Sequence, residues 1–381
     1  MADLNTTERK ERRMIGFDLS DEQRMIRETV AAFATEQIRP AARPADESGE
    51  IPAELIAKSW ELGLVCGPIP ETYGGYGDQR SAVTGAIIAE ELAFGDLAIA
   101  LHMLAPRLTA FPVLEMGTDA QRQAFLKPLC AGDFVPGSAA LMEPRYDYDA
   151  AALMTAAVHN GSGFILNGAK CYVPLAAESS SILVFAAGPE AGFEHVGGFL
   201  VDRKNPGLSI SAPEKNMGIK ALRTYELKLE QCRVDAGARL GGDRGINFPR
   251  VLSQSRVALA AMAVGVARAS FEYARDYAKE RKAFGVPIAV KQAIAFMLAE
   301  MAIEIDAARL LVWEAAWHLD RGEDATKESY QARNYAAQAC LTVADNAVQV
   351  LGGHGYIREH PVELWLRNAR GFAILDGLAI V

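Results

Sequence analysis

A carboxylate near the end of the chain is the first residue whose type and setting suit chemistry. Asp376 lies among apolar residues, in the run Ala-Ile-Leu-Asp-Gly-Leu from Ala373 to Leu378. An acidic side chain in such a setting is either a turn residue before Gly377 or a partly desolvated base with a raised pKa. Both readings stay open from this segment alone.

Three further segments combine glycine, arginine or aromatic residues in ways that suit ligand binding. Gly352-Gly353-His354-Gly355-Tyr356 is either a helix cap with a loop or a close backbone approach to a ligand. Glu280-Arg281-Lys282-Ala283-Phe284-Gly285 either balances a helix C-terminus or presents Arg281 to a phosphate beside an aromatic ring. Arg145-Tyr146-Asp147-Tyr148-Asp149 is either a solvated loop or a polar, aromatic cluster between domains.

The signatures of several large enzyme classes are absent from the sequence. There is no GxxxxGK[ST], HExxH or GxSxG motif and no strand–GxGxxG–helix unit. The six histidines are scattered, so no metal site is expected. The five cysteines are odd in number and contain no CxxC pair, which argues against a disulfide framework and fits a reducing cytoplasm.

The charge balance argues against nucleic acid and an anionic membrane surface as partners. The 381 residues include 48 acidic and 39 basic side chains, a formal net charge of −9, whereas nucleic-acid-binding surfaces are basic. The longest apolar run, Val257–Ala267, is too short to span a bilayer. The segment Met1–Met14 is polar and lacks the apolar core of a signal peptide.

The elements that must position these residues fall into three parts, and the expected fold class is α+β. Residues 1–133 form an N-terminal helical domain that opens on a Ser20–Gln23 capping box, with the first helix ending before Pro40. Residues 134–244 form a central β domain with a hairpin on an Asn167-Gly168 turn. Residues 245–381 form a C-terminal helical bundle of four-helix type. The predicted helices are 52–62, 82–92, 119–126, 251–282, 289–321 and 326–351, and the predicted strands are 163–166, 169–173, 182–186, 198–201, 208–211 and 225–229.

Taken together, these segments resemble the acyl-CoA dehydrogenase family over nearly the whole chain from Phe17. The matching runs are Ile69–Gly77, Glu90–Ala93, Met116–Thr118, Glu143-Pro144, Leu166-Asn167-Gly168-Ala169-Lys170, Met217-Gly218 with Thr224 and Glu226, Arg281 with Phe284, Gly285 and Pro287, and Gln349 to Tyr356. Their order and spacing agree with the family throughout. The resemblance implies an acyl-CoA dehydrogenase-like fold, FAD as the cofactor, and oxidation of an acyl thioester to its α,β-unsaturated product.

The resemblance also implies roles for individual residues. Asp376 would remove the α-proton while the β-hydrogen leaves as hydride to flavin N5, and its backbone N–H would donate to the thioester oxygen. The residues implied to bind FAD are Leu141, Met142, Tyr172, Arg281, Phe284, Gln349, Gly352 and Gly353; those implied at the substrate are Tyr148, Arg256, Leu375 and Gly377. Arg281 and Phe284 would reach the FAD of a neighbouring subunit, so a homo-oligomer, a tetramer or a dimer, is expected. Electron-transferring flavoprotein is the oxidant that the family implies.

Several departures from the family pattern fall at the chemistry. The usual Tyr-Glu-Gly-Thr run reads Leu375-Asp376-Gly377-Leu378, which keeps the carboxylate and shortens it by one methylene. The other base position known in the family is Ser255, just before Arg256. At flavin-facing positions, Met142, Tyr172 and Pro174 replace a threonine, a tryptophan and a threonine, and Tyr148 replaces a small serine near the CoA. The sequence stops at Val381, before the family's usual closing helix.

Three interpretations therefore remain. The first is an FAD-dependent acyl-thioester dehydrogenase with Asp376 as the base, acting on a CoA or carrier-protein thioester. The second keeps the flavin and the thioester pocket but runs a reduction, an elimination or a cyclisation. The third is a catalytically silent oligomeric scaffold.

Overall fold

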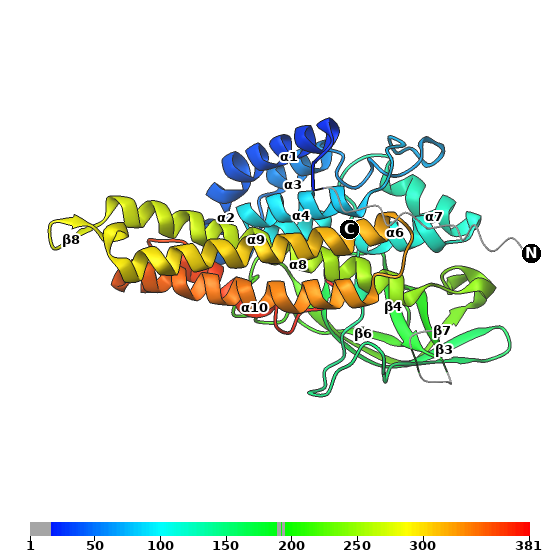
Figure 1. Ribbon diagram of the computed structural model, residues 1–381. Helices are drawn as coiled ribbons and strands as arrows, with labels where there is room; N and C mark the ends of the chain where they lie inside the picture. The colour runs from blue at the N-terminus through cyan, green and yellow to red at the C-terminus, as the bar shows by residue number, and fades with distance from the viewer. Residues whose placement is uncertain (1–16, 189–191, 193–194) are drawn as a thin grey trace, which may run out of the picture.

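A helical N-terminal part, a central sheet and a long helical bundle follow one another along the chain in the computed structural model, which describes residues 17–188, 192 and 195–381 (Figure 1). The helices are α1 (Asp21–Phe33), α2 (Arg39–Ser48), α3 (Ala53–Glu61), α4 (Ala82–Gly95), α5 (Leu97–Leu104), α6 (Arg107–Met116), α7 (Asp119–Leu129), α8 (Phe248–Glu280), α9 (Gln292–Asp320), α10 (Thr326–Leu351), α11 (Gly353–Tyr356) and α12 (Val362–Gly371). The strands are β1 (Ala139–Ala140), β2 (Ala156–His159), β3 (Gly163–Pro174), β4 (Ser181–Ala187), β5 (Val196–Asp202), β6 (Leu208–Ile210), β7 (Thr224–Asp235), β8 (Lys282–Ala283) and β9 (Val286–Pro287).

The first helix begins where its capping box predicts but does not end before Pro40. The Ser20 Oγ accepts from the Gln23 N–H at 3.1 Å, and the Gln23 side chain accepts from the Ser20 N–H at 3.0 Å. Residues 34–38 then continue as a π-helical turn into α2, whose first turn contains Pro40. Proline is tolerated there because its ring suits the first turn of a helix. The helical run ends only at Gly49, which is left-handed at φ +74°.

The expected hairpin at Asn167-Gly168 is wrong, because β3 runs unbroken from Gly163 to Pro174. It pairs antiparallel with the equally long β7, and the register shifts between Leu166 and Gly168, which marks a bulge. The Asn167 Oδ1 accepts from the Gln231 N–H at 2.8 Å across that bulge. A Cβ on Gly168 would lie 2.5 Å from the Thr155 Oγ1, so glycine serves strand packing here rather than a turn.

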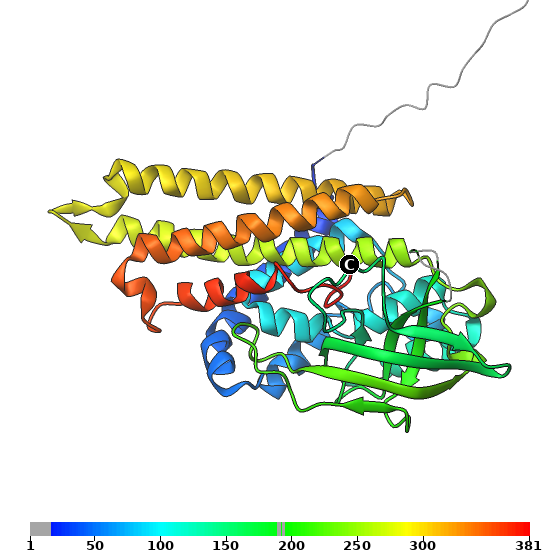
Figure 2. The same ribbon diagram turned by 90° about the horizontal axis from the view of Figure 1, so that it is seen from below.

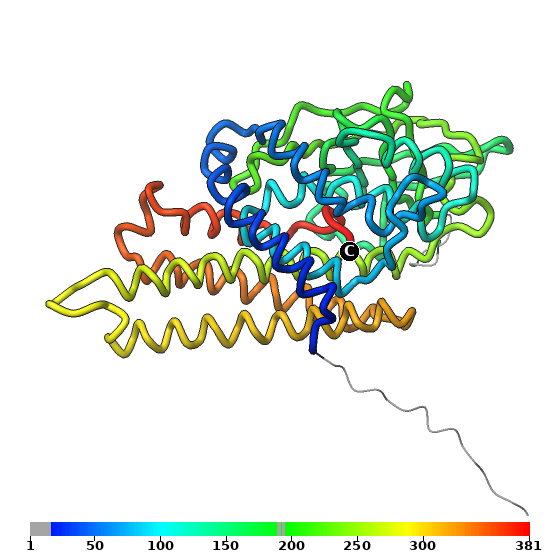
Figure 3. Tube along the Cα trace, turned by 90° about the horizontal axis from the view of Figure 1, so that it is seen from above, coloured from blue at the N-terminus to red at the C-terminus, as the bar shows by residue number. Residues whose placement is uncertain are grey.

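The sheet has seven strands in the order β1-β4-β2-β3-β7-β6, with β5 paired to β4. Its β1–β4 and β2–β4 pairs are parallel, and the remaining pairs are antiparallel. The sheet lies below the bundle in Figure 2, and the N-terminal helices lie on the opposite face in Figure 3.

The helices α8, α9 and α10 run side by side, and α12 packs on α8 and α10 to complete the four-helix type of bundle (Figures 1 and 2). The hairpin β8–β9 caps the end that extends furthest from the sheet (Figure 1). Within the described residues, α8 is the longest helix, with 33 residues.

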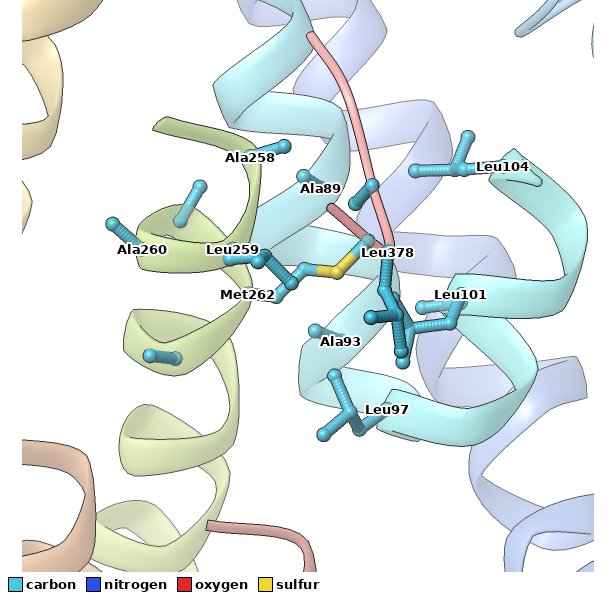
Figure 4. Close-up of a cluster of buried hydrophobic side chains, with 14 of the residues drawn as sticks. Ala89, Ala93, Leu97, Leu101, Leu104, Ala258, Leu259, Ala260, Met262 and Leu378 are labelled. Carbon is cyan, nitrogen blue, oxygen red and sulfur yellow. The ribbon is translucent and has the colours of Figure 1, made fainter. Parts of the chain in front are cut away.

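The core between α4, α5 and α8 is built from alanine and leucine and receives the end of the chain (Figure 4). Leu378, which directly follows the Asp376-Gly377 pair, inserts among Leu97, Leu101 and Met262. Small alanines such as Ala89 on α4 and Ala258 on α8 let the two helices approach closely. This packing anchors the loop that carries Asp376.

Two helical stretches, Leu97–Met116 and Phe248–Glu280, are long and apolar enough to cross a membrane by length and composition. Their most apolar windows are 89% and 78% buried inside the protein. That burial is the behaviour of core helices, so the two stretches are weak evidence for a membrane.

Candidate active site

Asp376 lies in the loop after α12, at the junction of the bundle and the sheet, and its side chain is partly buried. Burial raises its pKa above the ordinary value of 3.8, while Arg333 and Arg256 oppose that rise. The Gly377 N–H donates to the Asp376 Oδ1 at 3.1 Å. The carboxylate is therefore both desolvated and faced by cations, a combination typical of a working acid or base.

Arg256 from α8 and Arg333 from α10 supply those positive charges. The Arg333 guanidinium donates from Nη2 to the Leu375 carbonyl oxygen, which ties α10 to the Asp376 loop. The Arg256 guanidinium lies 5.3 Å from the centroid of the Tyr330 ring. Each arginine thus has a structural partner and still acts electrostatically on Asp376.

Two buried hydroxyl groups near this carboxylate have no hydrogen-bond partner among the described residues. The Tyr148 hydroxyl is one, and burial together with the charges of Asp376 and Glu143 raises the pKa of Tyr148. The Ser255 Oγ, one residue before Arg256, is the other. Ser255 and Gly377 also line a narrow apolar cavity with Leu141. Unsatisfied polar atoms of this kind are the groups that a polar ligand atom would engage.

A cavity of about 240 Å³ opens between the sheet and α12, next to the Asp376 loop. Its wall includes Tyr172 from β3, Gly218 and Asn216 from the segment before β7, and Ile374 and Leu375 from the loop after α12.

Tyr172 sits in a second bulge of β3, between Lys170 and Val173, at φ +51°. A non-glycine residue in the left-handed region is costly, and such strain gathers at functional sites. The Tyr172 N–H donates to the Glu214 Oε1 at 3.3 Å, and the Glu214 Oε2 is buried without a partner among the described residues.

Leu141 and Met142 connect this cavity to Asp376. The Asp376 N–H donates to the Met142 Sδ at 3.1 Å. Gly377 is left-handed at φ +71°, and a Cβ there would lie 2.8 Å from the Leu141 Cβ, so only glycine fits.

A buried ion pair holds the Leu141–Glu143 segment in place. The Lys170 Nζ, fully buried, donates to the Leu141 carbonyl oxygen at 2.9 Å and to the Glu143 Oε1 at 3.1 Å. The Glu143 carboxylate also accepts from the N–H groups of Met154 and Thr155, each at 2.8 Å. The sheet therefore fixes the backbone beside Asp376 through charge-assisted bonds.

The residues that the sequence nominates divide into two groups. The structure brings together eight of them around Asp376 and the cavity: Leu141, Met142, Tyr148, Tyr172, Arg256, Leu375, Asp376 and Gly377. The other five, Arg281, Phe284, Gln349, Gly352 and Gly353, are exposed, at the ends of α8 and α10 towards the β8–β9 hairpin (Figure 1). One copy of the chain does not bring the second group to the first.

Sequence reasoning missed Arg333 and Asn368, both of which contribute to the site. Asn368 lines the cavity, and its Oδ1 accepts from the Ile219 N–H at 2.7 Å. Arg333 lies next to Ala332 and three residues before Ala336 on the buried face of α10. A charged residue beside such an apolar stripe is the signal that would have found it. Over the stretches with described placement, no group of three His, Cys, Asp or Glu side chains could hold a metal ion.

Comparison with protein-family models finds three matches in chain order. The N-terminal, middle and C-terminal domain models of acyl-CoA dehydrogenase match residues 20–133, 138–232 and 245–379.

Known proteins are similar over almost the whole chain. A probable acyl-CoA dehydrogenase of Bacillus subtilis is 38% identical over 370 residues, covering 95% of this chain and 96% of the relative. A 3-(aryl)acrylate reductase of Clostridium sporogenes is 36% identical over 367 residues, with 95% and 96% covered. The solved structure of butyryl-CoA dehydrogenase from Megasphaera elsdenii superposes with a TM-score of 0.85 at 31% identity, with 96% of each chain covered.

Proposed function

Since this chain belongs to the acyl-CoA dehydrogenase family, and is thereby an FAD-dependent oxidoreductase acting on CH–CH groups, we propose that it desaturates an acyl thioester with Asp376 as the base. The observation that carries this proposal is the partly buried Asp376 carboxylate, with its raised pKa, beside Arg256 and Arg333 and next to the Tyr172 cavity.

The cavity suits the ring system of FAD. Its volume of about 240 Å³ can take a fused ring, with Tyr172 and Leu375 on its walls, but not a whole dinucleotide. The remainder of FAD must then extend outward, where Gly352 and Gly353 of a second copy would meet it; both have open space where a Cβ would stand. FAD, when bound, accepts the hydride that leaves the β-carbon.

The chain's own residues would supply the rest of the reaction. Asp376 takes the α-proton onto its carboxylate, and its raised pKa makes it a stronger base than an exposed aspartate. The Asp376 N–H, now donating to the Met142 Sδ, would donate to the thioester oxygen instead and stabilise the developing enolate. The free hydroxyls of Tyr148 and Ser255 lie where they can orient the thioester.

The test is anaerobic mixing of the holoenzyme with a panel of acyl-CoAs, read by bleaching of the flavin absorbance. Asp376→Asn should slow bleaching by about 10³-fold, the contribution of a positioned general base. Asp147→Asn is the matched control, because Asp147 is exposed and lies in the Tyr148 loop. Unchanged bleaching by Asp376→Asn would refute Asp376 as the base, and a colourless protein that binds no flavin would support the scaffold interpretation.

A reductive direction is the second candidate, and the same observation favours it. An Asp376 whose pKa is raised holds its proton more readily, and reduction of an enoyl thioester needs a proton donor at the α-carbon. The reductase among the relatives adds support. Product mass distinguishes the two, because dehydrogenation removes two hydrogens and reduction adds two.

We further propose a CoA or carrier-protein thioester as substrate, electron-transferring flavoprotein as acceptor, a homotetramer or dimer as the assembly, and the cytoplasm as the compartment. The exposed position of Arg281 and Phe284 supports a shared cofactor site. The absence of nucleic-acid and membrane partners stays an expectation from charge and composition.

A further inference from the structure

A second cavity, of about 520 Å³, lies in the helical N-terminal part and shares no lining residue with the Tyr172 cavity. Its lining comes from the start of α1, the segments 62–68 and 76–81, the first turns of α4, and the α6 residues Arg107 and Phe111. The volume falls within the range of small-molecule sites.

Arg107 is the unusual group in this cavity. Its side chain is only 2% exposed, and its Nη1 has no hydrogen-bond partner among the described residues. Its Nε and Nη2 both donate to the Leu64 carbonyl oxygen, with the Nε bond at 3.1 Å. Across the described ranges, no carboxylate forms an ion pair with it. A buried guanidinium without a counter-charge is expensive to keep.

A second arginine adds to the positive charge at the same place. Arg80 also lines the cavity, and its Nε is buried and unpartnered in the part of the chain that the structure describes. Both guanidinium groups approach the Phe111 ring, Arg80 at 4.3 Å and Arg107 at 5.1 Å from its centroid. Burial, with a smaller contribution from Arg80, lowers the pKa of Arg107 to about 9. A bound anion would relieve this desolvated charge.

The rest of the lining restricts the anion. Apolar side chains of Ile26, Leu62 and Ile88 form part of the wall. Glu22 and Asp78 also line the cavity and disfavour a doubly charged ligand. The third acid, Asp320, is occupied, because it accepts from the Ser81 hydroxyl at 2.7 Å and from backbone N–H groups at the start of α4.

We propose that this cavity binds a small organic monocarboxylate, with its carboxylate on Arg107 and its apolar body against Ile26, Leu62 and Ile88. The site is separate from the proposed catalytic one and would exist even if the reaction were different.

The test is calorimetric titration of the holoenzyme with hexanoate, hexanamide and inorganic phosphate. Hexanoate should bind at least tenfold more tightly than the uncharged hexanamide and than phosphate. Equal binding of hexanamide would show that Arg107 is not recognising charge, and tighter binding of phosphate would refute the monocarboxylate; either result overturns the proposal.

Variants locate the binding. Arg107→Met should weaken hexanoate binding at least tenfold, Arg107→Lys should restore part of it, and Arg24→Met, an exposed control on α1, should leave it unchanged. Gln79→Trp, at an exposed position of the lining, should also weaken binding without removing either guanidinium. Because Arg107→Met also removes the bonds to Leu64, this rim variant keeps the proposal falsifiable if Arg107→Met fails to fold.

The flavin spectrum separates this site from the catalytic one. Hexanoate bound at Arg107 should leave the flavin absorbance unchanged. A spectral change that persists in both Arg107→Met and Gln79→Trp would place hexanoate beside Arg256 and Arg333 instead, and would overturn the proposal.

Discussion

The backbone N–H of Asp376 donates a hydrogen bond to the Met142 Sδ at 3.1 Å, so the proposed base and a cofactor-side residue are directly joined. The bond crosses from the loop after α12 to the segment after β1. The donor that a thioester oxygen would need is therefore already engaged.

Met142→Leu should strengthen acyl-CoA binding. Leucine keeps the apolar volume but cannot accept, so substrate no longer competes for the Asp376 N–H. One neutral hydrogen bond is worth about 1 kcal/mol, which corresponds to a KM lowered about fivefold. Steady-state kinetics measure this, with the exposed Met154→Leu as control. A raised KM would mean that the Met142 bond holds the loop in its productive shape.

Arg333→Met should shift the pH dependence of flavin reduction to higher pH. The Arg333 charge favours the ionised Asp376 and thus lowers its pKa, so removing that charge raises the pKa. Since the base must be ionised, the rising limb of kcat/KM should move up by about one pH unit, and Arg333→Lys should restore it. An unmoved limb in Arg333→Met with a lowered plateau would assign Arg333 a packing role only.

Arg281→Met should weaken FAD binding without lowering the thermal stability of the apoprotein. Its side chain is exposed at the end of α8, and a lost charge-assisted bond to a phosphate costs about 1.5 kcal/mol, or about tenfold in Kd. Fluorescence titration of apoprotein with FAD measures the affinity. Lys279→Met, 63% exposed on the preceding turn, is the matched control. Equal affinity in both variants would remove Arg281 from the cofactor site.

Asp46→Asn should destabilise the protein at neutral pH by about 3 kcal/mol, because it leaves Arg367 and Arg358 without a partly buried partner. Burial raises the pKa of Asp46, but hydrogen bonds and charge from Arg367 outweigh it, so the net pKa is lowered. The stabilisation is thus complete above the unfolded pKa near 3.8 and is lost as pH falls through the lower folded value.

Urea denaturation across a pH series measures this dependence. The difference between wild type and Asp46→Asn should shrink below about pH 4, and Asp21→Asn, on an exposed side chain, should show no difference at any pH. A gap that stays constant into acid would mean that the Asp46 charge is not what stabilises the fold.

The helical elements were predictable because long apolar stripes leave few alternatives. The predicted helix 326–351 agrees with α10 at both ends. The Asn167-Gly168 turn was not predictable in the same way, since the competing partner is β7, about 60 residues later in the chain, and local turn preference carries no information on it.

The same limit separates the predicted from the missed parts of the site. Asp376 stands out locally as a carboxylate in an apolar run. Arg333 lies 43 residues earlier, and only the packing of α10 against the final loop brings its guanidinium to the Leu375 carbonyl. Contacts of this kind depend on tertiary structure and leave no local trace.

The continuous helix α8 has a consequence for how the protein would be saturated with cofactor. Arg256 and Arg281 are 25 residues apart along it, which at 1.5 Å per residue is about 38 Å. One rigid rod therefore holds a substrate-side cation and a cofactor-side cation too far apart for a single ligand. If each cofactor draws on two copies, its occupancy obeys mass action in the protein itself, and dilution alone would strip the flavin from an otherwise intact fold.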